Sequence, residues 1–260
     1  MSRKKYNYEQ FYTKNEIAKQ LSNIVKSFNW FKKIERIIVP SAGMGAFSSQ
    51  FENCIAFDID PKVKNIIKAD FLALEIPYQK NTLVIDNVPF GAQSSLALKF
   101  FKKSTLIGDY IAFILPLSFK KQSVQDKLNL NFHIIYENIL SENSFYTPIK
   151  EHYDIKSVFQ IWHKKSYKRQ KSPNYANFKD FEFVKKQEAD FAIMRVGINA
   201  GAIKNNLKEI REASHYFIKC NTNKDKIISK LNSINWKNIS DNSVSIRCIS
   251  KKEIIQQYLI

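Results

Sequence analysis

The stretch that decides the fold reads Ile34-Glu35-Arg36-Ile37-Ile38-Val39, followed by Pro40-Ser41-Ala42-Gly43-Met44-Gly45-Ala46-Phe47. Its first half is a short apolar run rich in isoleucine, which is typical of a buried strand in a parallel sheet. Its second half carries two glycines, which let the backbone turn tightly and let a ligand approach the main chain. The stretch predicts a strand, a turn that can bind a ligand and then a helix, although an ordinary strand-to-helix turn would look the same.

Outward from this stretch, similar apolar strands alternate with amphipathic helices. The strands are predicted at residues 54–59, 82–86 and 110–115, and the helices at 14–29 and 92–103. This alternation indicates an α/β fold with a doubly wound, mostly parallel sheet and right-handed crossovers. Two later segments are expected to form a hairpin at the edge of the same sheet, at residues 132–136 and 157–162.

The sequence predicts two domains, one of residues 1–172 and a small α/β domain of residues 173–260. In the second domain we expect strands and helices alternately, with strands near 189–196 and 214–220 and helices near 203–212 and 224–234. Residues 1–150 carry 20 basic and 13 acidic residues (20 − 13 = +7), and residues 151–260 carry 21 and 11 (21 − 11 = +10). The shorter part of the chain is therefore the more basic one.

The whole chain is strongly basic, with 41 Lys and Arg residues against 24 Asp and Glu residues and a net charge of +17. This favours a polyanionic partner such as nucleic acid. Apolar residues make up 44% of the chain, which excludes a disordered protein. The three cysteines form no Cys-x-x-Cys pair, and we expect no metal site. No apolar run is long enough to cross a membrane, so a soluble cytoplasmic protein is expected.

Two acidic segments follow the glycine-containing turn. Asp58 and Ile59 end the next strand, where a carboxylate can accept two hydrogen bonds from a ribose diol. Asp70 and Phe71 come later and offer an acceptor for an amino group beside an apolar ring. Each pair alone also fits a solvated loop, but their order along the chain favours a ligand site.

The strongest motif reads Asp86-Asn87-Val88-Pro89-Phe90-Gly91 and closes a buried strand. Asn87 would lie at the carboxyl edge of the sheet, where such folds bind their ligands. Its side-chain oxygen and a neighbouring main-chain carbonyl can accept both hydrogens of one amino group, and Pro89 stiffens the turn that holds them. Phe90 offers a ring on which a planar base can stack. The same residues are also common turn chemistry.

In this order the motifs resemble those of S-adenosylmethionine-dependent methyltransferases that methylate exocyclic amino groups, chiefly N6 of adenine in DNA or RNA. The resemblance covers roughly residues 10–165 and implies the class I, Rossmann-like fold with S-adenosyl-L-methionine as cofactor. It also implies that a phenylalanine-containing segment, Phe11–Thr13, helps to hold the cofactor. The implied cofactor-binding residues are Tyr12, Thr13, Pro40, Ser41, Ala42, Gly43, Gly45, Phe47, Asp58, Ile59, Asp70, Phe71 and Asn87. The implied catalytic residues, which hold the target amine, are Asn87, Val88, Pro89 and Phe90.

Two positions depart from that family. Its glycine loop usually begins with a glutamate where this chain has Val39, and its tetrapeptide usually has a proline where this chain has Val88. An aliphatic residue there also resembles the ribosomal RNA adenine dimethylases, so a ribosomal RNA methyltransferase is one alternative. The Pro-Ser-Ala-Gly loop and the flanking Asp86 and Gly91 resemble more closely the bacterial and phage DNA enzymes, such as those of restriction-modification. We therefore expect N6-adenine methylation with DNA preferred over RNA.

A basic segment, Trp162–Lys171, mixes cations with aromatic rings and contains no acidic residue. Such a segment can bind phosphates and stack on bases, and it is expected to clamp the target beside the methyl-transfer site, although a solvated lysine-rich loop is the alternative. The candidate substrate-binding residues are Phe90, Gly91, Lys164, Lys165, Lys168, Arg169 and Lys171. The C-terminal domain is expected to recognise the target, with Arg195 and the loop from Gly197 to Gly201 as candidate contacts. Outside the enzyme class, the alternative is a catalytically weak nucleic-acid-binding subunit of a methyltransferase complex.

Overall fold

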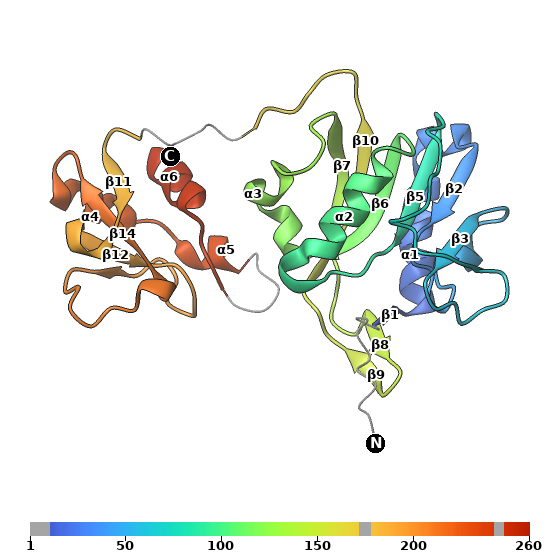
Figure 1. Ribbon diagram of the computed structural model, residues 1–260, viewed down its shortest axis with the longest axis horizontal. Coiled ribbons are helices and arrows are strands. Elements are labelled where there is room, and N and C mark those ends of the chain that lie inside the picture. The colour runs from blue at the N-terminus through green and yellow to red at the C-terminus, as the bar shows by residue number, and fades with distance from the viewer. Residues whose placement is uncertain (1–10, 172–177, 242–246) are drawn as a thin grey trace. The chain divides into compact units, whose positions relative to one another are not determined.

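The computed structural model describes residues 11–171, 178–241 and 247–260, and the chain forms two compact units (Figure 1). The first unit comprises residues 1–119 and 124–171, and the second comprises residues 120–123 and 172–260. Each unit has its own sheet and its own hydrophobic core. Among the described residues, no helix has both the length and the apolar character needed to cross a bilayer.

A seven-stranded, mostly parallel sheet forms the centre of the first unit, with the order β4-β3-β2-β5-β6-β10-β7. The strands from β4 to β6 are parallel to one another, and β10 is antiparallel to both of its neighbours. Their bounds are β2 (Arg36–Val39), β3 (Ile55–Asp58), β4 (Ile67–Lys68), β5 (Thr82–Asn87), β6 (Tyr110–Pro116), β7 (Phe132–Ile139) and β10 (Ser157–Lys164). This topology confirms the predicted fold class, a doubly wound, mostly parallel, Rossmann-like sheet.

The central strand β5 shows why the predicted strands are apolar throughout. Leu83 and Ile85 belong to a cluster that includes residues of helix α1 (Asn15–Ser27). Val84, between them, belongs to a second cluster that includes residues of helix α2 (Ser95–Ser104). All three side chains are fully buried. Because successive side chains point to opposite faces of a strand, a sheet covered on both faces requires apolar residues at every position.

The helix expected after the glycine-containing turn is absent, and that prediction was wrong. Between β2 and β3 the chain forms turns and one 3-10 helix, η2 (Ser48–Gln50). The segment contains two glycines and three serines, which favour turns over helix, and Asn53 adopts a left-handed conformation (φ +57°) that an α-helix excludes. The connection from β3 to β5 also has no helix and contains only the short strand β4.

The hairpin expected from residues 132–136 and 157–162 is confirmed, since β7 and β10 pair antiparallel. However, β10 lies inside the sheet and only β7 lies at its edge. A second, three-stranded sheet joins the beginning of the unit to the connection between these strands. It has the order β1-β8-β9, with bounds β1 (Tyr12–Thr13), β8 (Phe145–Thr147) and β9 (Lys150–Tyr153).

In its described residues, the second unit consists of an antiparallel sheet of four strands with three α-helices that follow the last strand. The strand order is β11-β14-β12-β13. The bounds are β11 (Phe181–Val184), β12 (Phe191–Met194), β13 (Ile203–Lys204), β14 (His215–Cys220), α4 (Lys224–Asn232), α5 (Trp236–Ser240) and α6 (Lys251–Leu259). A short helix, α3 (Gln122–Gln125), lies between β6 and β7. Ser250 begins α6 with a capping box to Glu253, which satisfies main-chain donors at the helix start.

The strands near 189–196 and 214–220 and the helix near 224–234 are confirmed by β12, β14 and α4. The helix expected at 203–212 was wrong, because that segment forms β13, turns and the 3-10 helix η6 (Glu212–Ser214). The side chain of Asn206 accepts a hydrogen bond from the main-chain N–H of Lys208 at 3.1 Å. Such a local bond offers the backbone an alternative to the helical pattern.

Candidate functional site

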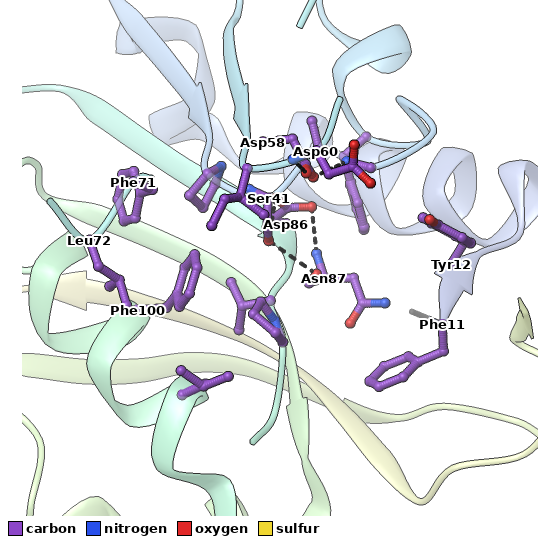
Figure 2. Close-up of a pocket in the computed structure, with 18 of the residues that line it drawn as sticks. Phe11, Tyr12, Ser41, Asp58, Asp60, Phe71, Leu72, Asp86, Asn87 and Phe100 are labelled. Carbon is purple, nitrogen blue, oxygen red and sulfur yellow. Dashed lines mark hydrogen bonds between the residues drawn. The ribbon is translucent and has the colours of Figure 1, made fainter. Parts of the chain in front are cut away.

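A cavity of about 500 Å³ lies at the carboxyl ends of β2, β3 and β5, and β1 forms part of its wall (Figure 2). This is the edge at which open α/β sheets bind their ligands. Most residues predicted to bind the cofactor or the target line this one cavity. They are Tyr12, Thr13, Pro40, Ser41, Ala42, Gly43, Phe47, Asp58, Ile59, Asp70, Phe71, Asn87, Val88, Pro89 and Gly91.

The glycine-containing turn after β2 is held by the neighbouring strand. Asp58, at the end of β3, accepts hydrogen bonds from the main-chain N–H of Gly43 at 2.7 Å and of Asp60 at 2.8 Å. Gly43 has a positive φ of +53°, and a Cβ atom at this position would lie 2.9 Å from Cε1 of Tyr12. Glycine is therefore required both for the turn and for the close packing of the Tyr12 ring on it. Gly45 shares the positive φ but does not line the cavity.

Asp86 links the same turn to the end of β5. Its carboxylate accepts hydrogen bonds from the main-chain N–H of Ser41 at 2.6 Å, from the Ser41 hydroxyl at 3.1 Å and from the N–H of Asn87 at 2.8 Å. The side chain is buried, and burial raises the pKa of Asp86 to about 7 despite these three bonds, with the nearby Asp58 carboxylate adding to the increase. Asp86 lines the cavity, so a group that changes charge near neutral pH faces its interior.

Two buried oxygen atoms at the cavity wall have no hydrogen-bond partner in the described part of the chain. They are Oδ1 of Asn87 and Oγ1 of Thr13. A buried polar atom without a partner costs roughly 1–3 kcal/mol. Both atoms have almost no accessible surface in this conformation, so a ligand would complete their hydrogen bonds only after a small rotation of the side chain toward the cavity. Asn87 is the residue that the sequence placed at the target amine. In Figure 2 the amide of Asn87 points toward the side of the cavity where Phe11 lies.

Phe90 does not line the cavity, in contrast to the open ring face that the sequence suggested. Its side chain is 4% exposed and packs edge-to-face with Phe11, with ring centroids 5.0 Å apart. The aromatic ring at the wall is that of Phe11, which also packs against Phe145 at 5.7 Å. In this conformation, a planar group beside Asn87 would meet Phe11 first.

An apolar wall of the cavity was missed by the sequence analysis. Leu96 and Phe100 lie four residues apart on α2 and face the cavity together with Leu72 and Phe71. The rings of Phe71 and Phe100 stack with centroids 5.5 Å apart. The sequence did contain a signal for this wall. The signal is an apolar pair, spaced four residues apart, in the helix that follows the Asn87 turn. Such a wall suits a flat apolar group.

The basic segment does not lie beside the cavity, which corrects that expectation. β10 is antiparallel to β6, so Ser157 pairs with Pro116 and His163 pairs with Tyr110 at the beginning of β6. Asn87, in contrast, pairs with Ile114 near the end of that strand. The five basic candidates therefore lie at or beyond the amino edge of the parallel strands, opposite the cavity: Lys164, Lys165, Lys168, Arg169 and Lys171.

Arg195 lies in the second unit at the end of β12, with its guanidinium over the Tyr216 ring at 5.4 Å. Gly197 and Gly201 both have a positive φ, of +98° and +100°. A Cβ atom at Gly201 would clash with Trp236, whereas nothing lies within 4 Å of one at Gly197. Tight turning and packing account for these glycines, and their contact with a target stays a prediction. No group of His, Cys, Asp and Glu side chains among the described residues is arranged to hold a metal ion.

No protein-family model and no curated protein matches this chain. A Pyrococcus horikoshii protein assigned provisionally as an RNA methyltransferase is 18% identical, with a TM-score of 0.47, over 61% of this chain and 88% of that chain. The 23S rRNA methyltransferase ErmE is 13% identical, with a TM-score of 0.40, over 62% of this chain and 71% of that chain. A Thermoplasma acidophilum protein is 16% identical, with a TM-score of 0.37, over 51% of this chain and 76% of that chain. At such values the likeness carries no argument about activity or substrate.

Proposed function

We propose that this protein is a methyltransferase that uses S-adenosyl-L-methionine to methylate the N6 amino group of adenine in nucleic acid. The observation that carries the proposal is the place of Asn87, which lines the cavity and whose buried Oδ1 has no hydrogen-bond partner among the described residues. An amide oxygen so placed suits an amino group that arrives with the substrate. The net charge of +17 supports a polyanionic substrate.

The cavity fits the proposed cofactor in size and in chemistry. Its volume of about 500 Å³ lies within the usual range for small-molecule sites. Phe71, Leu72 and Phe100 form an apolar wall for the adenine ring, and the carboxylates of Asp58 and Asp60 would accept hydrogen bonds from the ribose hydroxyls. Asp86 places a carboxyl group where it would favour a positively charged sulfonium. The proposed cofactor supplies an electrophilic methyl group.

The residues of the Asn87 turn would activate the target amine by hydrogen bonding. The lone pair of an exocyclic amine is delocalised into the base, which makes the nitrogen a poor nucleophile. If Oδ1 of Asn87 and the main-chain carbonyl of Val88 each accept one of its hydrogens, the nitrogen moves toward a tetrahedral geometry and its lone pair becomes available. Attack of this nitrogen on the methyl carbon would break the carbon–sulfur bond, release the neutral thioether and transfer one amine proton to solvent. No covalent enzyme intermediate would form, so positioning and electrostatics would supply the acceleration.

The direct test is Asn87→Ala. This change removes the hydrogen-bond acceptor and truncates no apolar core side chain. We therefore expect the rate of methyl transfer to fall by at least about a hundredfold, as when one oriented polar group is lost from other active sites. The cofactor should bind with an affinity within severalfold of wild type. Asn138→Ala, at an exposed position of β7, is the matched control and should keep full activity. Undiminished transfer by the Asn87 variant would contradict the assignment.

The class of nucleic acid is the second part of the proposal, with DNA preferred over RNA. Val88, in the place of the usual proline, favours ribosomal RNA as the second candidate. Transfer of a tritiated methyl group to separate pools of DNA, RNA and protein, followed by nucleoside analysis, distinguishes the two. N6-methyladenosine from RNA alone would replace the DNA assignment, and label in protein amides alone would overturn both. For duplex DNA the adenine must also leave the base stack to reach Asn87.

A further inference from the structure

The end of β10 and the loop that follows it, residues 164–169, are held by several hydrogen bonds although they are rich in lysine. Main-chain N–H groups of Lys164, Lys165 and Arg169 donate to the carbonyl oxygens of Asp109, Asn131 and Leu130 at 2.7–2.8 Å. The side chain of Asn131 also donates to the carbonyl of Lys165 at 3.1 Å. Neighbouring segments therefore hold the shape of this loop. Surface loops that carry only solvated charges are usually more mobile.

The side chain of Arg169 connects the loop to neighbouring segments of the first unit. Its Nε donates to the carbonyl of Phe132 at 2.6 Å, and its Nη2 donates to the carbonyl of Gln125 at 3.0 Å. Its guanidinium lies 5.2 Å from the centroid of the buried Trp162 ring. These contacts use two of the roughly five N–H donors of a guanidinium, so Arg169 shapes the loop and keeps donors for another group. Its assignment as a substrate-binding residue stays a prediction.

The lysines of the loop, in contrast, are left without partners of opposite charge. In the part of the chain that the structure describes, Lys164, Lys165 and Lys168 form no ion pair. Lys164 lies over the ring of Tyr78, with Nζ 4.2 Å from its centroid. Tyr167 is 63% exposed, and its ring edge packs on His133 at 4.7 Å. Unpaired cations beside exposed rings are the combination that binds phosphates and stacks on bases.

The same edge of the sheet carries further lysines from two other connections. Lys32 and Lys33 precede β2, and Lys80 precedes β5, so all three are exposed at the amino ends of parallel strands. Two carboxylates lie at the same edge and are bound by neutral donors: Asp109 accepts from the Tyr78 hydroxyl at 2.7 Å, and Glu35 accepts from the Asn81 amide at 2.9 Å. The lysines outnumber them. The result is a surface that we call the basic strip, which consists of Lys32, Lys33, Lys80, Lys164, Lys165 and Lys168.

We propose that the basic strip is a second binding surface for the nucleic-acid substrate, one that contacts phosphates far from the methylated base. The inference rests on the proposed substrate class. β6 separates the strip from the cavity edge, and its seven residues span about 23 Å at about 3.3 Å per residue. A substrate that contacts both edges must therefore extend well beyond the target nucleotide. Full affinity requires a long or folded nucleic acid, whereas the chemistry at Asn87 does not.

The test compares Lys165→Glu/Lys168→Glu with a control of equal charge change, Lys19→Glu/Lys99→Glu. The control lysines are exposed on α1 and α2 and belong neither to the cavity nor to the strip. Binding to one long DNA and one long RNA is measured against salt concentration, and methyl transfer is measured on both long substrates and on an oligonucleotide too short to reach both edges. We expect the strip variant to lose at least about tenfold in affinity for the long substrate, with a salt slope smaller by about 1.5, because each phosphate contact contributes about 0.7–0.9.

Transfer to the short oligonucleotide should equal that of wild type, and the control variant should bind long substrates like wild type. Lys165→Gln/Lys168→Gln removes the two charges without reversing them. It should therefore lose affinity for the long substrate too, but less than the Glu variant. Equal affinity and salt slope for the strip and control variants would show that the strip is only solvated charge. That outcome is distinct from failure of the proposed function, in which the wild type methylates no nucleic acid at all.

Discussion

Asp86 gives the cavity a charge that changes near neutral pH. Burial raises the pKa of this carboxyl to about 7, while Ser41 and Asn87 donate hydrogen bonds that favour its ionised form. The groups that face it from neighbouring elements are the hydroxyl of Ser41 after β2 and the carboxylate of Asp58 on β3. A cation in the cavity would favour the carboxylate and lower its pKa, whereas a neutral ligand would not.

This predicts a pH-dependent preference between the proposed cofactor and its demethylated product. As the pH rises through about 7, Asp86 ionises, so affinity for the sulfonium cofactor should increase and then level off. The neutral thioether product should show little of this change. The ratio of the two affinities should rise by about tenfold for each unit by which the cofactor lowers the pKa of Asp86. Calorimetric titration of both ligands between acid and alkaline pH measures it.

Asp86→Asn is the control for that measurement, because an amide does not ionise in this range. Its affinity ratio should be independent of pH. A ratio that stays pH-dependent in the variant would assign the effect to another group, such as Asp58. A ratio that is constant in the wild type would mean that Asp86 does not sense the charge of the ligand.

At the scale of residues, the sequence predicted what depends on local backbone chemistry. The positive φ of Gly43 and the place of Asn87 at the end of β5 both follow from the turn residues around them. The burial of Phe90 against Phe11 and the hydrogen bonds that Ser41 donates to Asp86 did not follow, because each joins segments that are distant in the sequence. Only the packed sheet determines such contacts.

At the scale of elements, β1 forms a cavity wall that a distant hairpin holds in place. β1 has two residues, and they pair with Tyr146 and Phe145 of β8. The main-chain N–H of Lys14 donates to the carbonyl of Ser144 at 3.1 Å, and the buried ring of Phe145 packs against Phe11. A two-residue strand cannot hold its position without such contacts. The hairpin therefore fixes the wall that includes Tyr12 and Thr13.

Phe145→Ala should therefore weaken cofactor binding. Loss of this buried ring costs about 3–5 kcal/mol of the free energy of unfolding and removes the support of Phe11. We expect the KM for the cofactor to rise about tenfold or more, with a smaller fall in kcat, because Phe145 packs against Phe11, whereas Asn87 is held at the end of β5 by its pairing with β6. Steady-state kinetics at a temperature where the variant is folded separates the two constants.

Phe132→Ala is the matched control, since Phe132 is equally buried at the start of β7 but belongs to the cluster around α2. It should lose similar stability and keep the KM of wild type. Equal changes of KM in both variants would mean that general destabilisation, and not the wall formed by β1, controls binding.

The sequence predicted the strands of the sheet better than their connections. Buried parallel strands are marked by continuous apolar runs, so β2, β5 and β6 were found directly. The segment after the glycine turn was expected to be helical by analogy with strand–helix alternation, but its glycine and serine content favours turns. The position of β10 between β6 and β7 was also missed, and with it the side of the sheet on which the lysines lie. A hairpin pattern does not specify which of its strands joins the sheet.

At the scale of the whole molecule, the two units have separate cores. In the first unit, Ile111 of β6 is fully buried in the cluster that includes α2. In the second, Ile193 of β12 is fully buried in a cluster with residues of α4 and α6. Because each unit has its own sheet and its own buried apolar side chains, each has the means to unfold cooperatively by itself.

Calorimetric unfolding should accordingly show two transitions rather than one. Ile111→Ala should lower the midpoint temperature of the first unit, and Ile193→Ala should lower that of the second. Each truncation of a buried side chain should cost about 2–5 kcal/mol of the free energy of unfolding. The proposed cofactor should raise only the transition that Ile111→Ala lowers, because every residue that lines the cavity belongs to the first unit and a ligand stabilises the state that binds it. A single transition that both substitutions and the cofactor shift together would instead make the chain one cooperative body, and the second unit would then contribute to the stability of the methyl-transfer site.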